Sequence, residues 1–111
     1  MIERISQYRN MWLFVFFDLP TETKQDRKAY AKFRKNLLTN GFTMFQYSIY
    51  IRNCPSFENL NVHIKRVKSF LPGCGKIVIF YVTEKQFANM ELFYGSKSQK
   101  IMTAPQQLEL F

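Results

Sequence analysis

A single carboxylate at the end of an apolar run is the side chain in this sequence best placed for chemistry. Asp18 follows the apolar stretch WLFVFF, residues 12–17, and precedes Leu19 and Pro20. Carboxylate oxygens are ligands that Mg²⁺ prefers, and the ion can activate water or stabilise the charge that develops on a phosphodiester. The alternative is that Asp18 only opens the turn before the proline. One carboxylate is too few for a metal centre, so a catalytic Asp18 needs a second one from elsewhere.

Basic side chains form the second group that could carry a function. The 111 residues include 16 Lys and Arg against 8 Asp and Glu, a formal net charge of +8. This balance favours nucleic acid or another polyanion as partner, although a solvated surface can have the same composition. Lysines repeat along one side of segment 21–40, opposite its apolar side chains, and could contact phosphates there. The candidate nucleic-acid-binding residues on this segment and on segment 57–71 are Lys24, Arg27, Lys28, Lys32, Arg34, Lys35, Lys65 and Arg66.

Other catalytic chemistry has little support in the sequence. It contains no GxGxxG or Walker loop, no GxSxG elbow and no HExxH motif. Cys54, Cys74 and His63 are a poor set of zinc ligands, so we expect two free thiols and a structural histidine. The first ten residues have no apolar signal segment, and no run approaches the roughly 20 apolar residues that span a bilayer. We therefore expect a cytoplasmic protein without a membrane partner.

The candidate residues lie on segments that alternate between strand and helix periodicity. In chain order, we expect a strand over 11–17, a helix over 21–40, strand character over 43–52, a helix over 57–71, a strand over 76–83, a polar turn at 84–86 and a short strand within 90–95. Ten residues are long for one strand, so 43–52 is either one strand or two short ones around a kink or tight turn. Thr23 and Asp26 have the spacing of a capping box, and Ser56 is expected to cap the second helix.

This order predicts an α+β fold, a ferredoxin-like βαββαβ sandwich with an added C-terminal strand. We divide the chain into an N-terminal extension (1–10), the ferredoxin-like core (11–83), and a C-terminal strand with a partner-docking tail (84–111). Both helices of such a fold cover one face of the sheet, yet segments 11–17 and 76–83 are apolar on both faces. We therefore expect a sheet-to-sheet homodimer that covers the second face. A two-fold axis near the strand ends would place Asp18 beside its own copy and supply the missing carboxylate.

Several short motifs in combination resemble the small CRISPR-associated protein of the spacer-acquisition complex, its non-integrase subunit. They are FFDLP after the first strand, a basic helix that ends in NGF, then FQYSIY, VTEKQF and MELFYG, within residues 11–95. The resemblance implies a homodimer of ferredoxin-like folds, with Asp18 as a Mg²⁺ ligand. It also implies a C-terminal strand that packs on the partner protomer or the integrase. Met44, Tyr50 and Phe17 stand where the family often has Arg, Phe and Tyr.

Three functions remain as alternatives. In the favoured one, which the resemblance implies, the homodimer serves antiviral defence through CRISPR adaptation. It binds duplex DNA and bridges integrase dimers in a heterohexamer-type complex, so that new spacers enter the CRISPR array. In the second, the protein is a Mg²⁺-dependent endonuclease that cleaves single-stranded RNA or duplex DNA at the Asp18 pair. The third is a toxin-type RNA interferase of the same fold, against which the long C-terminal extension argues. An RNA-recognition module is disfavoured because its aromatic and basic consensus is absent.

The last five residues, QLELF, suggest a docking role. They look like the pentapeptide by which bacterial proteins bind the replication sliding clamp. Their alternation also suits a simple edge strand, or β-augmentation onto the integrase. The candidate partner-docking residues are Leu108, Leu110 and Phe111.

Overall fold

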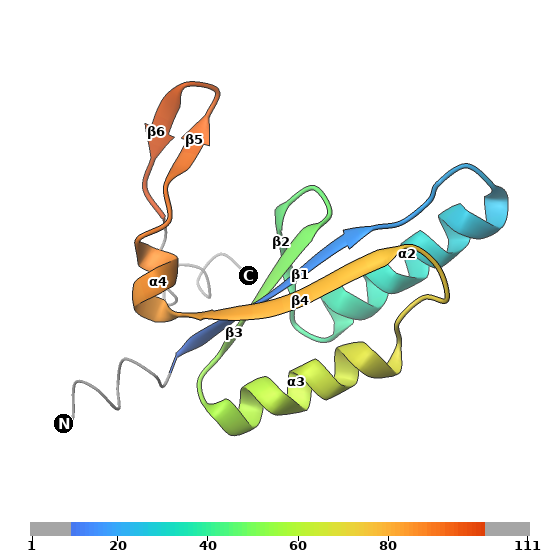
Figure 1. The fold of residues 1–111 in the computed structure, drawn as a ribbon, viewed down its shortest axis with the longest axis horizontal. Helices are drawn as coiled ribbons and strands as arrows, with labels where there is room; N and C mark the ends of the chain where they lie inside the picture. Colours follow the sequence, from blue (N-terminus) through green and yellow to red (C-terminus); the bar gives the residue numbers. More distant parts are fainter. Residues whose placement is uncertain (1–9, 102–111) are drawn as a thin grey trace.

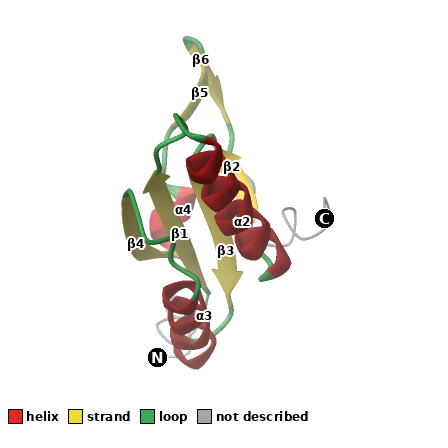
Figure 2. Cartoon of the chain, turned by 90° about the vertical axis from the view of Figure 1, so that its right-hand side faces the viewer, coloured by secondary structure: helices red, strands yellow, loops and turns green. Residues whose placement is uncertain are grey.

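The computed structural model describes residues 10–101, which form a four-stranded antiparallel sheet with two long helices on one face and a hairpin that projects beyond it (Figures 1 and 2). The elements, in chain order, are β1 (Met11–Asp18), α2 (Lys24–Thr39), β2 (Thr43–Gln46), β3 (Ile49–Cys54), α3 (Phe57–Ser69), β4 (Lys76–Thr83), α4 (Glu84–Ala88), β5 (Leu92–Tyr94) and β6 (Lys97–Gln99). The sheet order is β2-β3-β1-β4 and every pair is antiparallel. This is the ferredoxin-like α+β fold, which confirms the predicted class.

Helix α2 begins where the sequence places a capping box. The Thr23 hydroxyl accepts a hydrogen bond from the Asp26 backbone N–H at 3.0 Å, and the Asp26 carboxylate accepts one from the Thr23 N–H at 3.2 Å. These two bonds satisfy amides that have no partner within the helix, so α2 starts at Lys24 and not at residue 21. At the other end Gly41 has φ +83°, and a Cβ there would lie 1.7 Å from Arg52 Nη1. The positive φ therefore favours glycine after this helix, and the Arg52 guanidinium occupies the space beside it.

Helix α3 confirms its predicted cap but ends earlier than its apolar pattern suggested. The Ser56 hydroxyl accepts a hydrogen bond from the Asn59 backbone N–H at 3.0 Å. The helix stops at Ser69, so Leu71 lies beyond it and is exposed. Phe57, in the first turn, is also exposed, and its ring meets that of Tyr81 edge to face at 6.3 Å. Leu71 lies within segment 57–71, for which the sequence predicted a helix, and helical spacing alone did not show that the helix ends at Ser69.

Segment 43–52 forms two short strands, which confirms the second of the two alternatives. Ser48 has φ +66°, and with the exposed Tyr47 it forms the turn between β2 and β3. The pairing also shifts by one residue between Met44 and Gln46, a bulge in β2. The alternation of side chains between the two faces of the sheet therefore continues within β3, but the turn and the bulge interrupt it between residues 43 and 52.

The main core lies between the sheet and the two long helices. Alternate residues of β1 face the helices, and these side chains are buried against apolar residues of α2 and α3. The principal members are Met11, Leu13, Val15, Phe17, Phe33, Leu37, Leu60 and Val67. The ring of Phe17 meets that of Phe33 edge to face at 5.2 Å. This layer positions the end of β1, where the candidate carboxylate lies.

The second face of the sheet is covered over part of its area by the chain itself. The expected polar turn at 84–86 is wrong, because residues Glu84–Ala88 form helix α4. The ring of Phe87 stacks on Trp12 at 4.2 Å between centroids, and the indole N–H of Trp12 donates to Glu84. Trp12 and Phe14 are thereby buried. A single apolar residue among polar ones gave too little periodicity to predict a helix, and burial against Trp12 is what stabilises it.

A two-stranded hairpin follows α4 and projects away from the sheet (Figure 1). Its first strand, β5, was predicted from MELFYG, whereas β6 was not. Gly95, with φ +64°, lies in the tight turn between them. Within residues 10–101 no helix is long and apolar enough to cross a membrane.

Candidate metal and nucleic-acid sites

Asp18 is the last residue of β1 and its side chain is exposed. It alternates with Trp12, Phe14 and Phe16, so it lies on the second face of the sheet, away from α2 and α3. In the part of the chain that the structure describes, no group of three His, Cys, Asp or Glu side chains could hold a metal ion. Within the described residues, Asp18 therefore lacks the further ligands that a complete Mg²⁺ centre in one chain would need. A second copy of the chain would bring a second Asp18 carboxylate.

Two turns hold the end of β1 in place. On one side, the Phe17 backbone N–H donates to the Ser48 carbonyl oxygen at 3.0 Å. On the other side, Gly75 has φ +76°, and a Cβ there would lie 2.7 Å from the Asp18 carbonyl oxygen. The backbone of Asp18 is thus fixed between the β2–β3 turn and the loop before β4, while its carboxylate faces solvent. A carboxylate on a fixed strand end is better suited to a site than one on a free loop.

Lys76 lies directly across the strand pair from Asp18. The β1–β4 register makes the two Cα atoms partners, so their side chains project from the same face. The sequence analysis did not connect them, because they are far apart in the chain and only the register brings them together. A signal was present: segments 11–18 and 76–83 are both eight residues long and both have a charged residue at one end.

An exposed apolar patch adjoins Asp18 on the second face. It consists of Phe16, Val78 and Phe80, which are 37%, 43% and 37% exposed. Phe16 and Val78 are partners in register, and Phe80 meets Phe16 edge to face at 5.2 Å. We call these three residues the second-face patch. It is the part of the face that α4 leaves uncovered.

The basic residues of α2 lie on the other side of the molecule. Phe33 and Leu37 are buried against the sheet, and the lysines on the opposite side of the helix are exposed, as the periodicity predicted. These exposed lysines are Lys24, Lys28, Lys32 and Lys35. We call them the α2 lysine stripe. At 1.5 Å per residue the stripe is roughly 16 Å long, long enough to follow several phosphates.

The two candidate arginines of α2 have contacts within the chain. Arg27 Nη1 donates to the backbone carbonyls of Thr21 and Glu22, at 3.1 and 2.9 Å. Arg34 Nε donates to the Tyr50 hydroxyl at 2.7 Å. Both guanidinium groups therefore stabilise the fold, and the remaining N–H groups are available to a ligand.

Lys65 and Arg66 are exposed on α3, which covers the same face of the sheet as α2 (Figure 2). The predicted residues therefore separate into two sets: the basic ones on the helix layer, and Asp18 on the opposite face of the sheet. Leu108, Leu110 and Phe111 lie outside the described residues.

The cysteines and the histidine offer no catalytic alternative. Both thiols are free, Cys54 buried and Cys74 exposed. Burial raises the pKa of Cys54 to about 11, so this thiol stays protonated at neutral pH. Burial lowers the pKa of His63, and the nearby positive charges of Arg52 and Arg66 lower it further. His63 is inside the core, which agrees with the structural role predicted for it.

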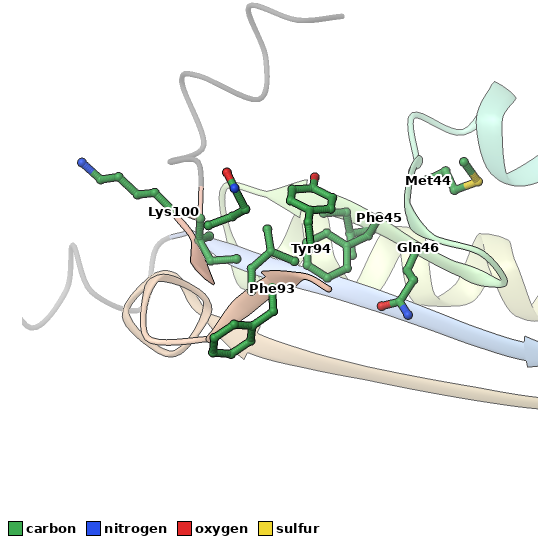
Figure 3. Close-up of a pocket in the computed structure, with 10 residues that line it drawn as sticks. Met44, Phe45, Gln46, Phe93, Tyr94 and Lys100 are labelled. Carbon is green, nitrogen blue, oxygen red and sulfur yellow. The ribbon is translucent and has the colours of Figure 1, made fainter. Parts of the chain in front are cut away.

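A cavity of about 610 Å³ lies between the β5–β6 hairpin and the edge of the sheet (Figure 3). Tyr94 and Phe45 approach each other there from the two sides, and Lys100 extends from the end of the hairpin. Among the candidate residues that fall within 10–101, none lines this cavity.

The fold and the site define a class of small α+β protein: a ferredoxin-like domain with one carboxylate at the end of its first strand and a basic helix after it. Residues 11–90 match the family model described as CRISPR associated protein Cas2. The chain belongs to this family, as its motifs had indicated.

Named relatives agree with this assignment. The chain is 56% identical over 108 residues to "CRISPR-associated endoribonuclease Cas2" of Flavobacterium psychrophilum, which covers 97% of this chain and 94% of the relative. It is 48% identical over 101 residues to the protein of the same name from Parvibaculum lavamentivorans, with 91% and 100% covered. For the protein of that name from Ligilactobacillus salivarius the identity is 41% over 97 residues, with 87% and 96% covered.

Proposed function

We propose that this protein serves CRISPR adaptation as a homodimer that binds duplex DNA and bridges integrase dimers. The α2 lysine stripe is the observation that carries the proposal. Its four ammonium groups are exposed along one line, whereas Arg27 and Arg34 are partly engaged within the chain. A row of unengaged cations on a rigid helix suits sequence-independent contact with a DNA backbone, which any new spacer requires.

The second-face patch supports the homodimer. Phe16, Val78 and Phe80 form a contiguous apolar surface on a face that α4 covers only in part. A second copy placed around a two-fold axis would bury the same patch from both sides. The helix layers would then point outwards, and each dimer would present two α2 lysine stripes to DNA.

Charge reversal on the stripe tests the DNA-binding role. The double variant Lys28→Glu, Lys35→Glu should weaken binding of duplex DNA about tenfold or more at moderate salt, and should reduce the slope of log affinity against log salt. Lys85→Glu, an exposed lysine on α4, is the matched control and should change both quantities much less. The DNA-binding role is wrong if the double variant binds no more weakly than the control.

The same variants test integration. In a spacer-integration assay with the integrase, the double variant should lose activity while it still elutes with the integrase in gel filtration. Loss of co-elution would instead assign these lysines to the protein interface. Full integration by the double variant would contradict the duplex-binding scaffold.

A second candidate function is Mg²⁺-dependent endonuclease activity at paired Asp18 side chains. The observation that favours it is the position of Asp18 on the uncovered part of the second face, next to the patch that a second copy would bury. Two carboxylates that meet there would match the oxygen donors that Mg²⁺ prefers, and the ion, when bound, can stabilise the charge of a phosphodiester undergoing cleavage. The relatives' name, endoribonuclease, makes single-stranded RNA the first substrate to test.

Asp18→Asn tests this candidate. The change keeps size and removes the charge, so it should abolish Mg²⁺-dependent cleavage of single-stranded RNA and leave the dimer and integration intact. Glu22→Gln, a nearby exposed carboxylate in the loop after β1, is the control and should cleave normally. Cleavage at the wild-type rate by Asp18→Asn would remove this residue from any active site.

A further inference from the structure

The cation nearest to Asp18 in the strand register is Lys76, at the first position of β4. The β1–β4 ladder pairs Asp18 with Lys76, and the Cα atoms of paired residues in an antiparallel sheet lie about 5 Å apart. Both side chains are exposed and both project from the second face. The four-carbon stem of a lysine is flexible, so its ammonium group can reach the space in front of the carboxylate.

The backbone of Lys76 is held as firmly as that of Asp18. Gly75 lies against the Asp18 carbonyl oxygen and the Leu19 side chain, where a Cβ would come within 2.7 and 2.5 Å. This close approach fixes the start of β4 on the end of β1. The charged pair is therefore a constant feature of the strand end and does not depend on a loop conformation.

Within the described part of the chain, the two side chains form no hydrogen bond that would hold the fold. Among the side-chain hydrogen bonds of residues 10–101, none involves Asp18 or Lys76. The α2 lysine stripe is on the opposite layer, so it cannot offset charge on this face. Lys76, the cross-strand partner of Asp18, is thus the cation placed beside the candidate carboxylate.

We propose that Lys76 binds the phosphate of the nucleic-acid strand at the Asp18 site. The inference rests on the proposed endonuclease function, and it names a substrate-binding group for that site. A phosphodiester that approaches Asp18 meets a like charge and is repelled by it. An ammonium group on the same face offsets this repulsion and forms charge-assisted hydrogen bonds with the phosphate oxygens.

The test measures binding apart from cleavage. A short, fluorescently labelled single-stranded RNA is titrated with the protein in a metal chelator at low salt, and cleavage is then measured in Mg²⁺. Lys76→Gln should weaken metal-free binding about fivefold and raise the KM by a similar factor. Lys76→Arg should retain both values, because it keeps the charge. Lys85→Gln, the control, should remain close to wild type. Thermal unfolding and gel filtration check that the exposed substitutions leave the fold and the oligomeric state unchanged.

The outcomes separate this inference from the endonuclease proposal. If cleavage depends on Asp18 while Lys76→Gln matches Lys85→Gln in binding and KM, the role of Lys76 is wrong and the Asp18 site stands. If Asp18→Asn still cleaves but Lys76→Gln weakens metal-free binding, the endonuclease site is wrong and Lys76 remains a phosphate contact. Equal loss for Lys76→Gln and Lys76→Arg would show that the positive charge is not what matters, and would also overturn the inference.

Discussion

The two faces of the sheet are built from equally apolar strands, but they are covered in different ways. On one face α2 and α3 bury alternate residues of β1 under a continuous layer. On the other, α4 buries Trp12 and Phe14 through Phe87, and the second-face patch stays exposed beside Asp18. The covered face accounts for stability within one chain. The second face is covered by α4 at one end only, and its uncovered end contains Asp18 and its cross-strand partner Lys76.

The largest effect is expected in the helix-side core. Leu37→Ala removes a fully buried side chain between α2 and the sheet and should lower the free energy of unfolding by about 3 kcal/mol or more. Urea denaturation followed by circular dichroism measures it. Leu38→Ala, the exposed neighbour, is the control and should cost well under 1 kcal/mol. Similar losses for the two variants would mean that this layer is not the main core.

A smaller loss is expected when α4 is detached from the second face. Phe87→Ala removes the ring that stacks on Trp12 and should cost about 2 kcal/mol, less than in the main core because the remaining strands stay covered by α2 and α3. The single tryptophan reports the change directly, since its emission should shift to longer wavelength as water reaches it. An unshifted spectrum in Phe87→Ala would contradict the stacking of these rings.

The helix-side core also contains a titratable group, and this predicts a pH dependence. His63 is buried, and its Nδ1 has no hydrogen-bond partner in the described part of the chain. Its folded-state pKa is lowered, so the unfolded chain binds the proton more tightly and stability falls as the pH drops below the ordinary histidine pKa of about 6.5. At higher pH the contribution is fully present. His63→Gln should flatten the stability curve between neutral and mildly acidic pH, and an unchanged curve would exclude His63 as its cause.

The smallest effect on stability is expected at the second-face patch. Val78→Ser removes an exposed side chain of this patch and should change the free energy of unfolding of the monomer by less than about 1 kcal/mol. The same change should weaken the proposed homodimer markedly, which sedimentation at several concentrations measures. A dimer as tight as wild type would place the interface elsewhere and would also remove the reason to pair two Asp18 side chains.

Most of the fold could be predicted from the sequence because most elements have a sequence pattern of their own. The capping box of Thr23 and Asp26, the glycine at 41 and the eight-residue strand at 76–83 are local features, and all three appear in the structure. Helix α4 and β6 were missed because they are only five and three residues long, and α4 in addition packs on Trp12, which is distant in the chain. Helix α4 is stabilised because Phe87 stacks on Trp12, and the sequence near residue 87 does not show that Trp12 lies beside it.

The residues of the candidate site could be predicted from the sequence, but their positions relative to one another could not. Sequence periodicity correctly placed the lysines of α2 on one exposed stripe, and it singled out Asp18 from its position after an apolar run. It could not show that Asp18 and the basic helix lie on opposite sides of the sheet, since that depends on which side each strand residue projects. It also gave no reason to connect Asp18 with Lys76, because the strand register sets that pairing.

The sequence by itself determined the element order up to β4, the charge of the helix layer and the presence of a carboxylate at the end of the first strand, because composition and periodicity are properties of short segments. Only the tertiary structure decided which apolar surface stays uncovered and which cation stands beside Asp18. Both depend on the antiparallel register of β1 with β4 and on α4 folding back over Trp12. Contacts of this kind form between residues far apart in the chain, and they follow from packing in three dimensions rather than from any local pattern.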